Sequence, residues 1–188
     1  MEGRRTALIV VVPEAETAVS QLRFELDPVA RLGVPAHVSV LFPFVPAAKI
    51  DEDVVARTAA LVQSVPVFQH NLFRSDWFGD EVLWLAPDAS EEFRSLTSRV
   101  VEAFPAYPPY EGQFDDVVPH LTIADRGPVE AMQAAERAVQ GHLPISAIAR
   151  AVTLMIEQSS GDWEAAASFA LADSEVAPTR LPREGPSA

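Results

Sequence analysis

The sequence predicts a mixed helix-and-strand fold of two similar lobes, because a short motif and the order of the expected elements both occur twice. The order strand, helix, strand, helix, strand runs through residues 7–73 and again through residues 82–157. The motif reads Pro35-Ala36-His37-Val38-Ser39-Val40 in the first copy and Pro119-His120-Leu121-Thr122-Ile123 in the second. About 30 residues separate each histidine from the next expected strand. We therefore expect a duplicated fold in which the two histidine strands meet at the middle.

The elements of the first copy are delimited by proline and by changes of hydrophobic period. An aliphatic run predicts the first strand, and Pro13 and Pro28 bracket the helix that follows. Alternation of apolar and polar residues predicts the histidine strand, and apolar residues at helical spacing predict a second helix that Pro66 ends. The expected elements are strand 7–12, helix 14–26, strand 37–41, helix 51–65 and strand 67–73.

The second copy shows the same signals. The turn-forming residues 75–80 predict a hairpin, and Ser90 is the expected N-cap of the helix after it. Gly141 follows the end of the last expected helix. The expected elements are strand 81–86, helix 90–104, loop 105–119, strand 120–124, helix 128–140 and a hairpin of strands 149–157 and 163–171. We expect one domain over residues 1–172 and a loose, proline-rich tail over residues 173–188.

Composition restricts the classes of protein and of partner. The chain has no cysteine, which excludes disulfides and thiolate chemistry. No apolar run approaches the ~18–20 residues that a membrane span needs, so we expect no membrane partner. We expect a cytoplasmic protein that is a monomer. A net charge of −13, with Lys49 the only lysine, disfavours extended binding to nucleic acid, which depends on cations against phosphates. A small anionic substrate in a locally favourable pocket remains compatible with this charge.

The repeated motif places chemically useful side chains on one face of each strand. Because side chains i and i+2 share a face, His37 and Ser39 point to one side of the first strand. His120 and Thr122 do the same on the second. Two imidazoles that titrate near neutrality can serve as base and acid, and two hydroxyls can donate hydrogen bonds to a phosphate. The sequence does not say which histidine is the acid and which is the base.

The two motifs, at positions 37 and 120, lie 83 residues apart. In this the chain resembles the two-histidine phosphoesterase superfamily, specifically its 2′-5′ RNA ligase-like branch, over about residues 7–171. The resemblance implies a bilobal α+β fold in which two antiparallel sheets with flanking helices surround a central cleft. It implies hydrolysis or formation of phosphodiesters next to ribose without metal or cofactor. It also implies that His37 and His120 are catalytic and that Ser39 and Thr122 bind the phosphate.

Several other residues are weaker candidates for the same site. Phe114 and Trp77 are expected in polar loops, where an aromatic ring can stack on a base. Arg126 follows the second motif and is a candidate for a phosphate contact. His70 and His142 have no repeated context and are expected to be ordinary surface or loop residues. A zinc site at the two motif histidines is a rival hypothesis, although the ligand spacing typical of zinc sites is absent.

The main hypothesis is a metal-independent phosphodiesterase acting on a small ribose-linked cyclic phosphate, such as a 2′,3′-cyclic nucleotide or ADP-ribose cyclic phosphate, or on a 2′-5′ linkage. Two alternatives stay open. One is an enzyme that ligates RNA 2′-5′ ends or opens a cyclic phosphate at an RNA end. The other is a non-catalytic module that binds nucleotides through the same motifs.

Overall fold

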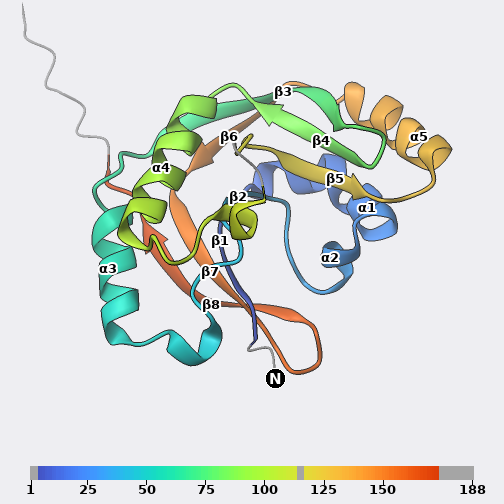
Figure 1. Cartoon of the computed structure of the whole chain (residues 1–188). Coiled ribbons are helices and arrows are strands. Elements are labelled where there is room, and N and C mark those ends of the chain that lie inside the picture. Colours follow the sequence, from blue (N-terminus) through green and yellow to red (C-terminus); the bar gives the residue numbers. More distant parts are fainter. Residues whose placement is uncertain (1–3, 114–116, 174–188) are drawn as a thin grey trace, which may run out of the picture.

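The computed structural model describes residues 4–113 and 117–173, which form two four-stranded antiparallel sheets with helices around them (Figure 1). The first sheet has the strand order β2-β1-β7-β8 and the second has the order β5-β4-β3-β6. The α+β class with two antiparallel sheets is therefore confirmed. The strands are β1 (Thr6–Val11), β2 (His37–Leu41), β3 (Phe68–Phe78), β4 (Val82–Pro87), β5 (Leu121–Asp125), β6 (Ile145–Ala149), β7 (Ala151–Glu157) and β8 (Trp163–Ala170).

The helices begin where the sequence supplies a suitable start. Asp51 caps α3 by accepting a hydrogen bond from the Val54 amide at 2.9 Å, and the Asp27 side chain caps α2 in the same way. Pro128 lies just before α5, at its N-cap position, and Gly141 follows its last residue. The helices are α1 (Glu16–Leu26), α2 (Pro28–Arg31), α3 (Glu52–Val62), α4 (Ser90–Ala103) and α5 (Val129–Gln140), with 3₁₀ turns at Pro13–Ala15, Ala47–Lys49 and Pro109–Gly112.

The two copies of the expected repeat exchange a strand. In the first copy β1 pairs with β2, and in the second β4 pairs with β5. The third expected strand of each copy joins the other sheet, because β3 pairs with β4 and β7 pairs with β1. The helices cross in the same manner, with α1 packed against β5 and α4 packed against β2. The histidine strands β2 and β5 are each an edge strand of their sheet, and they lie against one another.

The main core is formed by alternate residues of the strands. Val38 and Val40 of β2 are buried in it, as are Leu121 and Ile123 of β5. The residues between them, which carry the histidine motifs, are therefore on the opposite faces of the two strands. The remaining strand residues of this core include Leu8, Val10, Leu72, Leu83, Leu85, Ile145, Ala147, Val152 and Leu154. The core thus anchors both motif strands through the aliphatic half of each motif.

Two predicted boundaries are wrong because strand pairing overrides the local turn signals. The expected turn at residues 75–80 is part of β3, which continues to Phe78 and pairs with Val82. The turn is shorter and centres on Gly79, whose positive φ of 59° suits glycine. Strand β6 has no counterpart among the expected elements. It is paired with β3, and after Arg150 the chain enters the first sheet as β7.

Two single-residue expectations are also corrected. Ser90 is the first residue of α4 and not its N-cap, because its hydroxyl donates to the carbonyl of Pro87 at 2.9 Å. His70 is buried, 2% exposed, and its ring packs edge-on against Phe93 at 5.1 Å between centroids. Burial also lowers the pKa of His70, so this imidazole belongs to the core. Within the described residues, no helix is long and apolar enough to cross a membrane.

Candidate active site

The two motifs have the same local structure. In both, the histidine and the hydroxyl residue are half-buried, while the aliphatic residues after them are buried. Each strand also carries a β-bulge at the same place, since the pairing skips Val40 in β2 and Ile123 in β5. A bulge bends a strand and changes the direction of its side chains. The alternation predicted from the sequence is confirmed, and the duplication extends to an irregularity that the sequence does not reveal.

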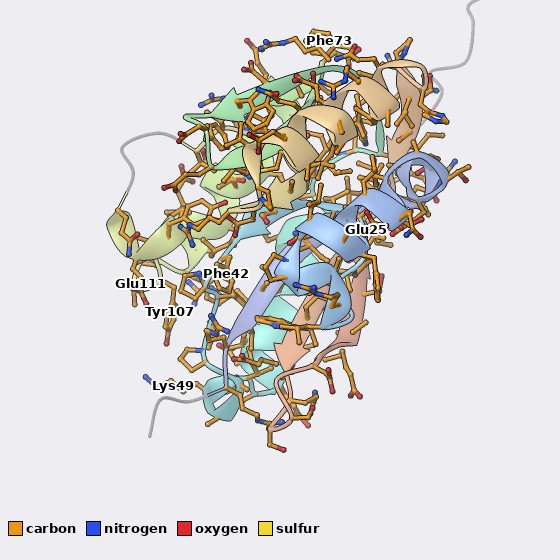
Figure 2. The ribbon with its side chains drawn as sticks, turned by 90° about the vertical axis from the view of Figure 1, so that its right-hand side faces the viewer. Glu25, Phe42, Lys49, Phe73, Tyr107 and Glu111 are labelled. Carbon is orange, nitrogen blue, oxygen red and sulfur yellow. The ribbon has the colours of Figure 1, made fainter. Side chains whose placement is uncertain are left out.

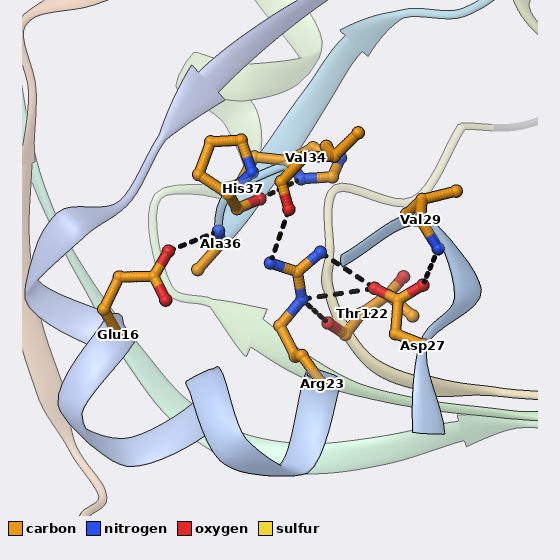
Figure 3. A network of polar contacts seen from close by, with 9 residues as sticks. Glu16, Arg23, Asp27, Val29, Val34, Ala36, His37 and Thr122 are labelled. Atoms are coloured by element: carbon orange, nitrogen blue, oxygen red, sulfur yellow. Dashed lines mark hydrogen bonds and ion pairs between the residues drawn. The ribbon is translucent and has the colours of Figure 1, made fainter. Parts of the chain in front are cut away.

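Both imidazoles are held by the same hydrogen bond. Nδ1 of His37 lies 2.7 Å from the carbonyl oxygen of Pro35, and Nδ1 of His120 lies 2.7 Å from that of Val118. A carbonyl oxygen only accepts, so each Nδ1 must carry a hydrogen. The hydrogen bond at Nδ1 therefore fixes the orientation of each ring (for His37, see Figure 3). In the neutral state Nε2 of each ring is left as a proton acceptor, and in the charged state it is a donor.

The surroundings keep both imidazoles neutral. Burial, the Arg23 guanidinium and the charge of His120 lower the pKa of His37 to about 4, against the opposing effect of the Pro35 carbonyl. Burial also lowers the pKa of His120, and the Val118 carbonyl opposes it. An anion bound between the rings would favour their charged forms and raise both pKa values. The site is therefore arranged so that protonation follows the arrival of negative charge.

Aromatic side chains pack beside His120. The ring of Phe78 meets the imidazole edge-on at 5.0 Å, the ring of Trp84 lies 5.8 Å from it, and the two aromatic rings stack at 4.7 Å. The sequence pattern does not single out this pair. Trp77, the expected stacking residue, is in β3 opposite Leu83 and packs on the main core, so its predicted loop position is wrong. The available signal was the alternation in β4, which puts Trp84 on the face opposite to Leu83.

The segment after the loop at 105–108 contacts the first motif. A hydrogen bond joins the side chains of Tyr110 and Ser39, while burial raises the pKa of the Tyr110 phenol. The Tyr110 amide donates to the carbonyl of Phe42 at 2.7 Å, which ties this segment to the end of β2. Tyr110 and Glu111 both have positive φ, 48° and 57°. Non-glycine residues in this region cost roughly 1 kcal/mol or more each, so tertiary contacts hold the segment in place.

A cavity of about 900 Å³ lies beside Tyr110, and none of the four motif side chains is among its lining residues. Tyr110 connects it to the first motif, because this residue both lines the cavity and contacts Ser39. Arg5 in its wall pairs with Glu157 at 2.7 Å and lies 5.8 Å above the Phe42 ring. Figure 2 labels Phe42, Tyr107 and Glu111 on this side of the molecule. The lining residues include Arg4, Arg5, Phe42, Phe44, Tyr107, Tyr110, Glu111, Gln113 and Glu157.

The remaining candidates lie elsewhere or outside the described residues. Arg126 is 75% exposed, and its Nε is 3.5 Å from a carboxylate oxygen of Glu81 and 3.9 Å from one of Asp125. It comes six residues after His120 along an extended strand, so about 20 Å of chain separates them. Phe114 lies outside the described residues. Of the sequence candidates, the structure therefore brings together His37, Ser39, His120 and Thr122.

The donor set at the motifs is two imidazoles and two hydroxyls. Among residues 4–113 and 117–173, no three histidine, aspartate or glutamate side chains come close enough together to hold a metal ion. Structural zinc sites normally have four ligands and catalytic ones three, so one histidine from each strand is a poor match. This arrangement suits proton transfer better than metal binding.

Comparisons with known proteins agree with this geometry. A sequence model of the 2′-5′ RNA ligase superfamily matches residues 11–161. Two similar solved structures are TT0787 of Thermus thermophilus, at 17% identity and a TM-score of 0.64, and E. coli LigT complexed with 3′-AMP, at 15% and 0.57. In each case the alignment covers 90% of this chain and 99% of the other.

E. coli LigT complexed with NADP+ is also similar, at 17% identity and a TM-score of 0.54, with 92% of this chain and 99% of the other aligned. At these identities the likeness concerns the fold. No curated protein gives a significant sequence match. The family match covers most of the chain and both histidine motifs, and it agrees with the two antiparallel sheets. The chain belongs to the 2′-5′ RNA ligase superfamily of two-histidine phosphoesterases.

Proposed function

We propose that this protein is a metal-independent phosphodiesterase that hydrolyses a small ribose-linked cyclic phosphate or a 2′-5′ linkage, with His37 and His120 as the acid–base pair. The observation that carries the proposal is the identical support of the two imidazoles. Each Nδ1 is bound to a backbone carbonyl at 2.7 Å, and β2, which begins with His37, contacts β5, which begins directly after His120. Such a pair can take a proton at one Nε2 and deliver one at the other.

In the proposed reaction one neutral imidazole accepts a proton from water as the water oxygen bonds to phosphorus. The bond between phosphorus and a ribose oxygen breaks, and the other, charged imidazole donates its Nε2 proton to that oxygen. The products are a phosphomonoester and a free ribose hydroxyl. The hydroxyls of Ser39 and Thr122 donate to the non-bridging phosphate oxygens, where negative charge is held during the reaction. The two imidazoles return to their starting states by exchanging protons with water.

The cavity beside Tyr110 is the proposed location of the nucleoside. Tyr110, which lines this cavity, is hydrogen-bonded to the hydroxyl assigned to the phosphate, and Phe42, Tyr107 and Tyr110 offer aromatic faces there. E. coli LigT has been solved with 3′-AMP and with NADP+. These complexes support a small nucleotide as the substrate class here. Arg4 and Arg5 lie in the cavity wall, and Arg5 forms an ion pair with Glu157.

The proposal predicts turnover in the presence of a chelator. Purified protein should be incubated with EDTA, dialysed and offered 2′,3′-cyclic nucleotides, 2′-5′ dinucleotides and ADP-ribose cyclic phosphate, with product release followed by phosphorus NMR. Activity on one of these classes is expected to be unchanged by chelation, because the described site supplies proton donors and acceptors but no metal cluster. Loss of activity that zinc or manganese restores stoichiometrically would show that the mechanism is wrong.

The RNA-end alternative is favoured by the family to which the chain belongs. It predicts that binding becomes tighter as the RNA becomes longer, whereas the small-nucleotide proposal predicts little dependence on length. The net charge of −13 leaves few cations for a run of phosphates. We expect an RNA of about ten nucleotides to bind no more than about threefold more tightly than a dinucleotide, with a log–log salt slope below about 2. Fluorescence anisotropy over a range of salt concentrations measures both quantities. Much tighter binding of the longer RNA with a steep salt slope would make RNA ends the leading substrate.

Binding without turnover on any of these substrates would favour the third hypothesis, a nucleotide-binding module. That outcome is separable from an inactive preparation, because phosphate binding can be followed independently through the imidazole resonances of His37 and His120.

A further inference from the structure

Arg23 is a buried cation between the two histidine strands. It comes from the last turn of α1, it is 2% exposed, and it is among the largest fully buried side chains of the described residues. A buried guanidinium is costly unless its donors are paired. Its hydrogen bonds therefore indicate what holds it there, and Figure 3 shows them.

The guanidinium contacts the residue that precedes the first motif and a residue of the second motif. Nη1 donates to the carbonyl of Val34 at 3.2 Å, and Nε donates to the carbonyl of Thr122 at 3.1 Å. Val34 precedes Pro35, whose own carbonyl holds Nδ1 of His37. Thr122 is the hydroxyl residue of the second motif. One rigid, planar group thus connects the segment that orients the first imidazole to the strand that carries the second motif.

Asp27 compensates the positive charge of Arg23 and orients its guanidinium group. Its Oδ2 accepts from Nη2 of Arg23 at 2.8 Å and from Nε at 3.2 Å, while its Oδ1 accepts from the Val29 amide at the start of α2. The Asp27 side chain is only 3% exposed. Burial raises the pKa of Asp27, and the Arg23 guanidinium opposes this effect. Helix α1 has a further anchor on the first motif, because Glu16 accepts from the Ala36 amide at 2.7 Å.

The guanidinium also distinguishes the two imidazoles electrostatically. The charged and titratable groups around His37 are Glu16, Arg23 and Asp27 from α1 and its C-terminal end, and His120 from the β5 side. Of these, Arg23 and His120 act on the pKa of His37, and both lower it. Within the described part of the chain, no charged group acts on the pKa of His120 in the same way. The cation therefore favours the neutral form of one imidazole of the pair.

We propose that Arg23 is a positioning residue that holds the two histidine strands together and favours the neutral, proton-accepting form of His37. The proton-accepting role of His37 rests on the proposed acid–base function, whereas the effect of Arg23 on the strands and on His37 does not. Arg23 touches neither the substrate nor the reacting atoms in this scheme. It acts through the carbonyls of Val34 and Thr122 and through its charge.

Two variants separate geometry from charge. Arg23→Lys keeps the positive charge but loses the fork, so kcat is expected to fall about 10-fold with an unchanged pH profile. Arg23→Met/Asp27→Leu removes both charges without leaving one buried alone. Here kcat should fall about 30–100-fold, and the acid limb of kcat/KM should move up by about one pH unit. Thr58→Val is the matched control, because Thr58 is buried and its hydroxyl bonds only within α3.

A second measurement does not need turnover. The imidazole resonances of His37 should titrate about one unit higher in the double variant than in the wild type or in Arg23→Lys, while those of His120 move less. Wild-type kcat in Arg23→Lys would overturn the positioning role. An unmoved His37 titration in a folded double variant would overturn the charge role. A wild type without turnover on any substrate, but with the expected titration shift, would reject the proposed function and leave the effect of Arg23 standing.

Discussion

Replacing either His37 or His120 by alanine is expected to lower kcat by about 10²–10⁴-fold, the usual contribution of one general acid or base. Each imidazole is held in one tautomer by a backbone carbonyl at 2.7 Å, and neither of the chain's other two histidines is placed to take over its proton. His70 is buried against Phe93, and His142 is exposed in the loop after α5. Steady-state kinetics on the substrate found with EDTA present would measure the loss.

The expected changes in kcat for other variants provide a scale for the loss caused by the single histidine replacements. His142→Ala should leave kcat unchanged, because its side chain lies outside the site. Ser39→Ala and Thr122→Ala should each lower kcat about 10-fold or less, since each removes one neutral hydrogen bond worth about 1 kcal/mol. The double histidine variant should lose less than the product of the single losses, because the pair acts as a unit. Near-complete activity in a folded single histidine variant would remove that histidine from the mechanism.

The two motif strands could be predicted because the alternation of apolar and polar residues within each strand shows which side chains are buried. Strand β2 has the predicted bounds of His37–Leu41, since each aliphatic residue reaches the core and each polar residue does not. The same alternation predicts β5, and the proline and glycine signals predict the helices within a few residues. What alternation cannot give is the partner of a strand. The exchange of β3 and β7 between the sheets, and the separate strand β6, depend on contacts distant in sequence.

The parts of the site that the sequence did not reveal depend on such distant contacts. Arg23, near the end of a helix, is typical of a solvated position that favours the helix dipole. Its burial depends on residues 27–34 folding back so that Asp27 and the Val34 carbonyl surround it. Trp84 escapes sequence reasoning because only the pairing of β4 with β5 puts its ring beside His120. The sequence thus identifies the reacting groups, and tertiary structure identifies the groups that orient them.

The pH dependence of kcat/KM is expected to be a bell with its maximum below pH 6.5. The acid limb reflects His37, whose pKa is lowered to about 4, because one imidazole of the pair must be neutral. The alkaline limb reflects the imidazole that must be charged, and burial lowers the pKa of His120 below its ordinary value of 6.5. Activity requires one bound proton, so kcat/KM should fall about tenfold per pH unit above the maximum. At about pH 8.5 it should be at least about 100-fold lower than at the maximum.

The profile of kcat should be displaced to higher pH than that of kcat/KM. The first reports the enzyme–substrate complex and the second the free enzyme, and the bound phosphate raises the pKa of both imidazoles. Measuring both between about pH 4 and pH 9 in a constant-ionic-strength buffer tests the displacement directly. A kcat/KM that stays flat or rises from about pH 6 to pH 9 would mean that no imidazolium takes part.

Stability must be measured alongside, because the same imidazole links folding to pH. The pKa of His37 in the folded protein, about 4, is below its unfolded value of 6.5, so the unfolded chain binds the proton first as the pH falls. The free energy of unfolding is therefore highest above about pH 6.5 and decreases between there and pH 4, by up to about 3 kcal/mol. Urea unfolding of the wild type and of His37→Gln at about pH 7 and pH 4 isolates this contribution, since the variant should lose less stability in acid. An acid limb of kcat/KM that follows the unfolding curve, and not the titration of His37, would assign that limb to loss of the fold.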